Sequence, residues 1–433
     1  MDVQPERFLI RGLSGEKKLA GVIPVGGAKN ASLKLFAAAL LVPGEVIFEN
    51  VPDIEDIRQM ADLIVALGGK AERLGPNKYS IDGRGVRDGS IDATIAKKFR
   101  ASVVLLGPLL ARFGSVRLPH PGGDVISKSR PIDFFIHAFQ KMGATVHDQI
   151  DQYFFDAKKG LSGGSIFFHF QSVTATEAVL MAATVADGIT TIKNAALEPE
   201  ILDLAQFLTA CGARIDGAGT STISVEGVPS LHQPAHPYCV MPDRLEAGSF
   251  LILGALSASE LKITNCIPAH LESLFELLER SGVHFSHSQN EIVVSNTPNK
   301  RKAFQAVSVR THEYPGFPTD LQAPMTVFLT QTEGESDVQE TIFDGRLAYT
   351  EDLKRMGANI ETVNPHKVVV HGPTKLIGRT LESPDIRAGL AFLFAGIVAE
   401  GESILNNVHH VDRGYERIEK RLRAIGVEIE RVR

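Results

Sequence analysis

Several polar clusters in this chain carry residue types that suit a small anion. In the first cluster, residues 26–30 read Gly-Gly-Ala-Lys-Asn and precede an expected helix. Glycine lets the backbone approach a ligand closely, and a lysine at a helix N-terminus suits a phosphate group. The Gly-Lys-Ser/Thr ending of a Walker A loop is missing, so a plain helix-start turn remains an alternative for Lys29.

A second cluster spans residues 121–133 and combines glycine, Asp124 and Arg130 before a helix expected to begin near Pro131. A glycine-rich stretch of this length is typical of a lid over a binding site, because glycine supplies the hinges. An ordinary surface loop is the alternative interpretation.

Asp320 forms the centre of a third cluster, Phe-Pro-Thr-Asp at residues 317–320. Pro318 and Thr319 predict a helix start, which places Asp320 in the first turn. The helix dipole stabilises a carboxylate there, so Asp320 is either a stabilising helix charge or a general base.

Arg387 and Arg413 each lie at the expected mouth of a helix, and the helix after Arg413 is expected over residues 415–425. A cation at a helix N-terminus opposes the dipole and lowers stability. We therefore favour an anion-binding role for both arginines over a solvated surface role.

Metal and redox chemistry have little support in the sequence. The spacing of His232, His236 and Cys239 resembles a metal site, but prolines interrupt it and no fourth ligand is near. The three cysteines form no Cys-x-x-Cys pair and, being odd in number, indicate no disulfide framework. We expect no metal and no cofactor.

The elements that must position these clusters recur along the chain. A helical stretch ends in a Gly-containing signature at Gly68, Gly143, Gly212, Gly282, Gly357 and Gly426. The interval is about 70 residues, and an extended stretch follows each signature. The clearest unit, which contains Gly212, predicts the order β-α-β-α-β-β. The repetition predicts six such units.

A proline-rich stretch divides the repeats into three and three. We expect an α/β protein of two domains, residues 1–21 with 241–433 and residues 22–228, with a linker at 229–240 and a cleft between the domains. The N-terminal strand at residues 7–11 needs a sheet to join, which makes the first domain discontinuous.

Composition limits the classes of function. The chain has 433 residues and a net charge of -6, which argues against a general nucleic-acid binder. Its apolar runs are too short to span a bilayer, and its first residues do not read as a signal peptide, so we expect a cytoplasmic protein with no membrane or nucleic-acid partner. The sequence gives no view of the oligomeric state.

With these motifs the chain resembles the enolpyruvyl transferases, in the branch that acts on UDP-N-acetylglucosamine. The resemblance covers essentially the whole length. It is carried by residues 26–31, 100–102, 107–109, 118–133, 194–200, 242–244, 317–320, 387–388 and 412–417.

The resemblance implies a two-domain inside-out α/β barrel with three β-α-β-α-β-β units in each domain. It also implies a reaction. The 3′-hydroxyl of UDP-N-acetylglucosamine adds to C2 of phosphoenolpyruvate, and phosphate leaves, in the first committed step of peptidoglycan synthesis.

Site residues follow from the same resemblance. It implies that Lys29, Arg130 and Arg413 hold the phosphate of phosphoenolpyruvate and that Arg387 holds its carboxylate. Asp320 would be the base, and Asp124 would donate a proton from the lid. The residues implied to contact the nucleotide sugar are Asn30, Arg100, Pro131, Asp133, Ile342 and Arg346.

Three positions depart from the family pattern. Asp124 stands where most members have cysteine, which predicts insensitivity to fosfomycin, a compound that alkylates that thiol. Phe135 and Phe170 replace polar residues near the nucleotide, where an aromatic ring could stack on uracil. The lid is also one residue longer.

Two alternatives remain open at this stage. One is a 3-phosphoshikimate 1-carboxyvinyltransferase-like activity, which is less favoured because residues 27–31 lack that family's Lys-Ser-x-Ser-x-Arg opening. The other is a non-catalytic paralogue that binds a nucleotide sugar and regulates a partner.

Overall fold

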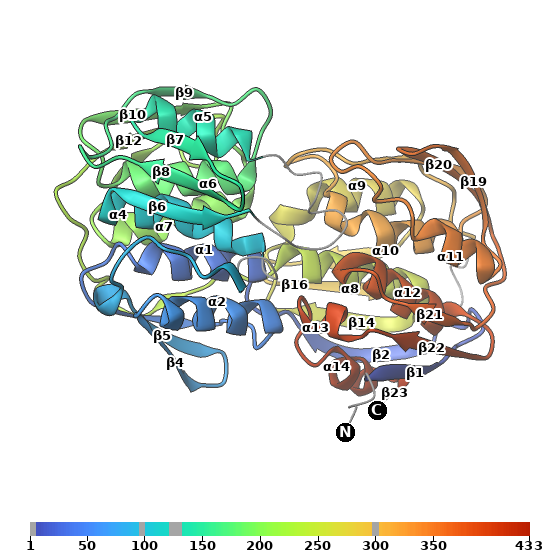
Figure 1. Cartoon of the computed structure of the whole chain (residues 1–433). Helices are drawn as coiled ribbons and strands as arrows, with labels where there is room; N and C mark the ends of the chain where they lie inside the picture. Colours follow the sequence, from blue (N-terminus) through green and yellow to red (C-terminus); the bar gives the residue numbers. More distant parts are fainter. Residues whose placement is uncertain (1–5, 95–99, 121–131, 297–302) are drawn as a thin grey trace. The chain divides into compact units, whose positions relative to one another are not determined.

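The protein is described by a computed structural model that covers residues 6–94, 100–120, 132–296 and 303–433 (Figure 1). Two compact units make up the chain. One comprises Met1–Gly26 and Pro242–Arg433, and the other comprises Gly27–Met241. Residues 229–240, for which the sequence favoured a linker, are part of the second unit.

Three four-stranded sheets belong to the first unit, with strand orders β21-β22-β1-β23, β15-β16-β14-β2 and β17-β18-β20-β19. In each sheet one edge strand pairs in parallel and the other pairings are antiparallel. The strands are β1 (Arg7–Arg11), β2 (Leu19–Pro24), β14 (Ala258–Thr264), β15 (Phe285–His287), β16 (Glu291–Ser295), β17 (Val309–Arg310), β18 (Gly334–Gln339), β19 (Asn359–Asn364), β20 (Lys367–Gly372), β21 (Thr380–Glu382), β22 (Glu402–Asn406) and β23 (Glu428–Val432).

The second unit repeats this pattern in sheets β13-β3-β5-β4, β11-β12-β10-β9 and β6-β8-β7. In the three-stranded sheet, a parallel bridge between Ser90 and Arg117 stands in the place of the parallel edge strand. The strands are β3 (Glu45–Glu49), β4 (Lys70–Gly75), β5 (Lys78–Asp82), β6 (Ser115–Pro119), β7 (Thr145–Asp148), β8 (Gln152–Asp156), β9 (Ser165–Phe167), β10 (Ile189–Lys193), β11 (Arg214–Asp216), β12 (Thr222–Glu226) and β13 (Tyr238–Cys239).

Helices form the interior of each unit. In the first unit α8, α10 and α12 pack on one another, and every residue of α8 is buried. In the second unit α4 packs on α6, and α1 packs on α7. The helices are α1 (Lys29–Ala39), α2 (Glu55–Ala66), α4 (Leu106–Phe113), α5 (Asp133–Lys141), α6 (Val173–Ala183), α7 (Pro199–Ala210), α8 (Arg244–Ser257), α9 (Glu272–Arg280), α10 (Thr319–Leu329), α11 (Thr350–Arg355), α12 (Ile386–Val398), α13 (His409–Asp412) and α14 (Ile418–Ala424).

The sheets cover these helices with one face. Strands such as β3, β10 and β22 alternate buried and more exposed residues, as a sheet with one solvated face requires. This is the two-domain inside-out α/β fold that the family resemblance implied, with helices inside and sheets outside. The described strands form six separate sheets rather than one closed barrel.

Glycine follows the ends of six helices, α2, α5, α7, α9, α11 and α14. All six glycines of the repeated signature have a φ between 87° and 106°, the left-handed region that other residues avoid. The structure also reveals a repeated asparagine that the sequence analysis did not single out as a pattern. Asn50, Asn194, Asn265 and Asn407 each follow the central strand of a sheet with φ 55–57°.

The first three of these asparagines donate a side-chain hydrogen bond to a carbonyl of the chain just beyond the parallel edge strand. The acceptors are the carbonyls of Val240, Phe168 and Val25, at 2.7–2.9 Å.

Within the described part of the chain, no helix combines the length and the apolar character that crossing a bilayer needs.

Candidate functional site

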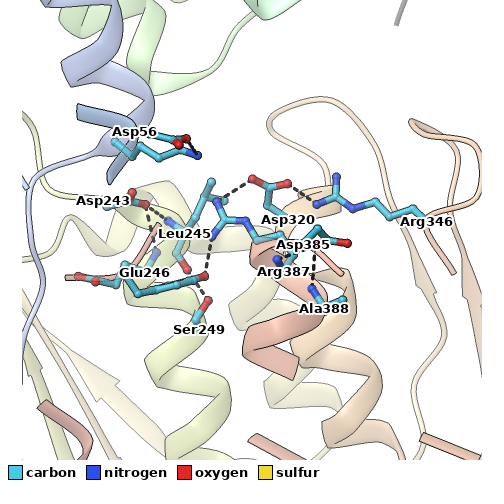
Figure 2. A network of polar contacts seen from close by, with 12 residues as sticks. Asp56, Asp243, Leu245, Glu246, Ser249, Asp320, Arg346, Asp385, Arg387 and Ala388 are labelled. Atoms are coloured by element: carbon cyan, nitrogen blue, oxygen red, sulfur yellow. Dashed lines mark hydrogen bonds and ion pairs between the residues drawn. The ribbon is translucent and has the colours of Figure 1, made fainter. Parts of the chain in front are cut away.

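The inner helices of the first unit begin at polar residues. Asp243 caps α8 by accepting hydrogen bonds from the backbone N–H groups of Leu245 and Glu246, at 2.8 and 3.1 Å. Asp385 caps α12 in the same way, through Arg387 and Ala388 at 2.8 and 2.9 Å (Figure 2). These caps satisfy backbone donors that a helix leaves unpaired and so fix where each helix begins.

Asp320 lies in the first turn of α10, between two arginines from distant parts of the chain (Figure 2). Its Oδ1 accepts a hydrogen bond from Arg346 Nη2 at 2.7 Å, and its Oδ2 accepts one from Arg387 Nη2 at 2.8 Å. The side chains of Arg346 and Arg387 are 6 % and 9 % exposed, while Asp320 keeps 25 % of its side-chain surface exposed. The carboxylate can therefore still be approached by a ligand.

The two guanidinium groups dominate the electrostatics of Asp320. Burial alone would raise the pKa of its carboxyl group, but the charges and hydrogen bonds of Arg387 and Arg346 outweigh burial and hold the pKa well below the usual carboxyl range. Asp320 balances only one of the two guanidinium charges, and the carboxylate of Asp243 also acts on Arg387.

Arg387 has a second partner in its own unit. Its Nη1 donates to the hydroxyl of Tyr415 at 2.5 Å, and its guanidinium lies 5.5 Å from the Tyr415 ring centre. Tyr415 is fully buried. The sequence analysis quoted Tyr415 within a motif but gave it no role, and nothing in its local pattern indicates a contact with residue 387.

Arg413 lies just after α13 and not at the start of a helix, so the predicted placement is wrong. The sequence predicted a helix beginning at residue 415, whereas α14 begins at Ile418. A cation at a helix C-terminus agrees with the dipole. The preceding residue, Asp412, is held by Arg431 of β23, with N–O distances of 2.6 and 2.8 Å. This ion pair fixes the segment that carries Arg413.

In the second unit Lys29 is the first residue of α1, as the sequence predicted. Its Nζ lies 3.0 Å from Asp56 Oδ2 of α2, and its side chain is 13 % exposed. Asn30 follows it in the first turn and is partly buried. Lys29 thus lies at the positive end of the α1 dipole, and its ammonium group is paired with the carboxylate of Asp56.

An ion pair lies deeper in the same unit. Lys34 of α1 and Glu177 of α6 lie 3.3 Å apart, and both side chains are buried. Burial raises the pKa of Glu177, and the charge of Lys34 opposes this rise. The pair links two inner helices behind Lys29.

The remaining predicted residues are scattered over other elements. Asp133 starts α5 and is exposed. Ile342 follows β18, and its backbone N–H donates to Glu340 Oε1 at 2.8 Å. Arg100 opens a 3-10 helix, Arg100–Leu105. Asp124, Arg130 and Pro131 lie outside the described residues.

The two aromatic departures have different environments. Phe135 is 5 % exposed and belongs to the apolar core of the second unit, so its ring packs inside the protein. Phe170 is 71 % exposed and is available to a ligand. Burial argues against a stacking role for Phe135, whereas the stacking role of Phe170 stays a prediction.

The histidine and cysteine spacing forms no metal site in the part of the chain that the structure describes, where no group of three or more His, Cys, Asp or Glu side chains could hold an ion. His232 Nδ1 lies 2.9 Å from the carbonyl of Gln233.

Comparison with known proteins gives the chain's relatives. The family model for EPSP synthase (3-phosphoshikimate 1-carboxyvinyltransferase) matches residues 13–422. UDP-N-acetylglucosamine 1-carboxyvinyltransferase 1 of Caldanaerobacter subterraneus is 41 % identical over 95 % of this chain and 97 % of the relative. UDP-N-acetylglucosamine 1-carboxyvinyltransferase of Koribacter versatilis is also 41 % identical, over 99 % of this chain and 96 % of the relative.

Solved structures share the fold. The enolpyruvyl transferase NikO from Streptomyces tendae superimposes with a TM-score of 0.88 at 24 % identity, covering 99 % of each chain. EPSP synthase from Acinetobacter baumannii gives a TM-score of 0.72 at 18 % identity, covering 99 % of this chain and 100 % of that one. At these identities the likeness establishes the architecture alone.

Proposed function

The chain belongs to the EPSP synthase family of carboxyvinyltransferases, and from that premise we propose that it transfers the enolpyruvyl group of phosphoenolpyruvate to the 3′-hydroxyl of UDP-N-acetylglucosamine, with release of phosphate. Relatives with that activity in their names align over nearly the whole chain at 41 % identity. The structural observation that carries the proposal is the Asp320 carboxylate held between Arg387 and Arg346.

Phosphoenolpyruvate carries a carboxylate and a phosphate, and each needs fixed cations. We assign the carboxylate to Arg387, whose planar guanidinium fork matches it. We assign the phosphate to Lys29, Arg130 and Arg413. The position of Lys29 at the positive end of α1 supports this assignment.

The acceptor needs a polar surface and a base. We propose that Asn30, Arg100, Pro131, Asp133, Ile342 and Arg346 position the nucleotide sugar, with Phe170 available to stack on its base. Asp320 accepts the proton of the attacking hydroxyl, and its exposed surface supports access by that group.

The proposed reaction balances with two carboxyl groups. During addition, the acceptor oxygen bonds to C2, its proton passes to Asp320, and Asp124 protonates C3. During elimination, the bond between C2 and the phosphate oxygen breaks, Asp124 takes a proton back from C3, and the Asp320 proton leaves with phosphate. Both residues return to their starting states, and no cofactor or metal enters the balance.

The biological role follows from the product. We propose that the protein supplies the first committed intermediate of peptidoglycan synthesis in the cytoplasm, and thus acts in cell-wall biogenesis, cell shape and cell division. The alternatives are transfer to shikimate 3-phosphate and a non-catalytic nucleotide-sugar-binding paralogue. The names of the relatives do not favour either alternative.

Phosphate release distinguishes these possibilities. With phosphoenolpyruvate, we expect release with UDP-N-acetylglucosamine and none with shikimate 3-phosphate. Asp320→Ala should lower kcat by at least about 100-fold, the usual scale for loss of a general base, while Asp344→Ala, at an exposed carboxylate, should keep the wild-type rate. The proposed function would be refuted if phosphate were released only with shikimate 3-phosphate, or if no phosphate were released with either acceptor.

A further inference from the structure

Arg387 is held at three points, of which one is unlike the others. Its backbone N–H is fixed by the Asp385 cap of α12, and its Nη1 is fixed by the buried Tyr415 hydroxyl. Its Nη2 binds the partly exposed Asp320. A ligand that reaches this site can therefore replace the Asp320 contact without disturbing the other two.

Arg346 provides independent evidence that the cluster of Asp320, Arg346 and Arg387 can bind a ligand. Its Nη2 binds Asp320, but its Nη1 has no hydrogen-bond partner among the described residues, although the side chain is only 6 % exposed. An unsatisfied buried donor is costly, and the cost is greater for a charged group. The cluster thus holds one more donor and one more positive charge than Asp320 can satisfy.

The same geometry conflicts with a simple role for Asp320 as a base. Both of its carboxylate oxygens accept hydrogen bonds from guanidinium groups, which hold its pKa well below the usual range. A carboxylate in this state does not take a proton from a hydroxyl group. One of the arginines must change partner before the reaction can begin.

We propose that Asp320 acts as an internal anion that occupies Arg387 until the carboxylate of phosphoenolpyruvate takes its place, and that this exchange frees Asp320 to accept the proton of the acceptor hydroxyl. The proposal rests on the proposed function for the identity of the substrate. In it Tyr415 is a positioning residue, because it holds Nη1 of Arg387 while Nη2 changes partner. Binding of one substrate thereby activates the base that acts on the other.

The exchange makes a counterintuitive prediction for Asp320→Asn. This variant should lose turnover yet bind phosphoenolpyruvate about tenfold more tightly than the wild type, because the substrate no longer competes with an internal carboxylate for Arg387. Isothermal titration calorimetry without acceptor measures this directly. Asp344→Asn is the charge-matched control, since it removes one negative charge at an exposed position outside the cluster, and its affinity should change less than about twofold.

Inorganic phosphate separates exchange from a general charge effect. The gain in Asp320→Asn should be large for phosphoenolpyruvate and small for inorganic phosphate, which has no carboxylate. Equal gains for both ligands, or unchanged or weaker binding of phosphoenolpyruvate by a folded variant, would overturn the proposal.

A structure of the wild-type protein with phosphoenolpyruvate covers the case in which the variant does not fold. Arg387 Nη2 should then contact the substrate carboxylate and not Asp320 Oδ2, while Nη1 stays on Tyr415. An intact Arg387–Asp320 contact beside bound substrate would refute the exchange. The calorimetric titrations and the structure with phosphoenolpyruvate use no acceptor. The proposed exchange can therefore fail while phosphate release still supports the proposed function. Likewise, the assay of phosphate release can fail while the binding experiments support the exchange.

Discussion

The charged side chains of this protein are of two kinds. Some can bind a further ion, and others have their charge balanced within the protein. Arg387 and Arg346 share one carboxylate, so each has capacity for a further anion. Arg431, by contrast, binds Asp412, Glu419 and Glu6 and has its charge fully matched within the protein. Residues of the first kind suit a binding site, and residues of the second kind hold the site in place.

Asp124 gives a prediction at the scale of one residue. We expect no time-dependent inactivation by fosfomycin, because a carboxylate is a far weaker nucleophile than the thiolate that this compound alkylates. Assays of residual activity over time should show a flat line for the wild type and a progressive loss for Asp124→Cys. Progressive loss in the wild type would show that another group reacts.

Among the elements, the two-residue strand β13 depends on its neighbours. The Tyr238 hydroxyl donates to the Asp203 backbone carbonyl at 2.8 Å and to Asp203 Oδ1 at 3.0 Å. Asp203 lies on α7, so this contact joins the helix to the edge strand of a different sheet. Burial raises the pKa of Asp203 to about 6, although the Tyr238 hydrogen bond opposes the rise.

The raised pKa predicts a stability change with pH. The folded state holds the Asp203 proton up to about pH 6, whereas an aspartate in the unfolded chain releases it near pH 3.8, so this contribution to stability falls as pH rises through that window. The loss should be on the order of 2–3 kcal/mol. Denaturation from pH 4 to 7 should show a flatter profile for Asp203→Asn.

Asp216→Asn, at an exposed position on β11, is the control and should keep the wild-type slope. If Asp203→Asn and the wild type have the same slope, Asp203 does not hold its proton in the folded state.

For the whole molecule, the two units differ in how they use the chain. Every strand of the second unit's sheets comes from Gly27–Met241. The first unit needs its N-terminal segment, because β1 lies between β22 and β23, and β2 is the parallel edge strand beside β14.

This difference predicts the behaviour of fragments. Residues 27–241 should fold alone, with cooperative thermal unfolding followed by circular dichroism. Residues 242–433 should not, since the β22 and β23 strands lose the one that joins them and an apolar face is left open. Fusing residues 6–26 to the second fragment through a flexible linker should restore folding. Cooperative unfolding of 242–433 alone would contradict this reading of the sheets.

Close packing restricts which residue can stand at position 27, where the chain passes from the first unit into the second. A Cβ atom on Gly27 would lie 1.6 Å from the Asn50 carbonyl oxygen, which is backbone and cannot move aside. Glycine was expected here because it permits ligand approach. The structure gives a different reason, which is contact with the protein's own backbone.

Local patterns were enough to predict much of this protein. The six glycine signatures predicted helix ends because a left-handed C-cap depends on a few neighbouring residues, and all six have positive φ. Lys29 at the start of α1 and Asp320 in the first turn of α10 followed from the same short-range signals. The helix expected at residue 415 failed because the turn at 413–417 delays it to Ile418.

The sequence by itself thus determined the repeat, the order of elements in its clearest unit and the residue types that could bind an anion, because these depend on interactions within a few residues. Tertiary structure alone decided which strands pair and which charges meet. Asp320 finds Arg346 across 26 positions and Arg387 across 67. No periodicity reports such contacts, since they exist only after distant segments have packed, and they determine whether Asp320 is held or free.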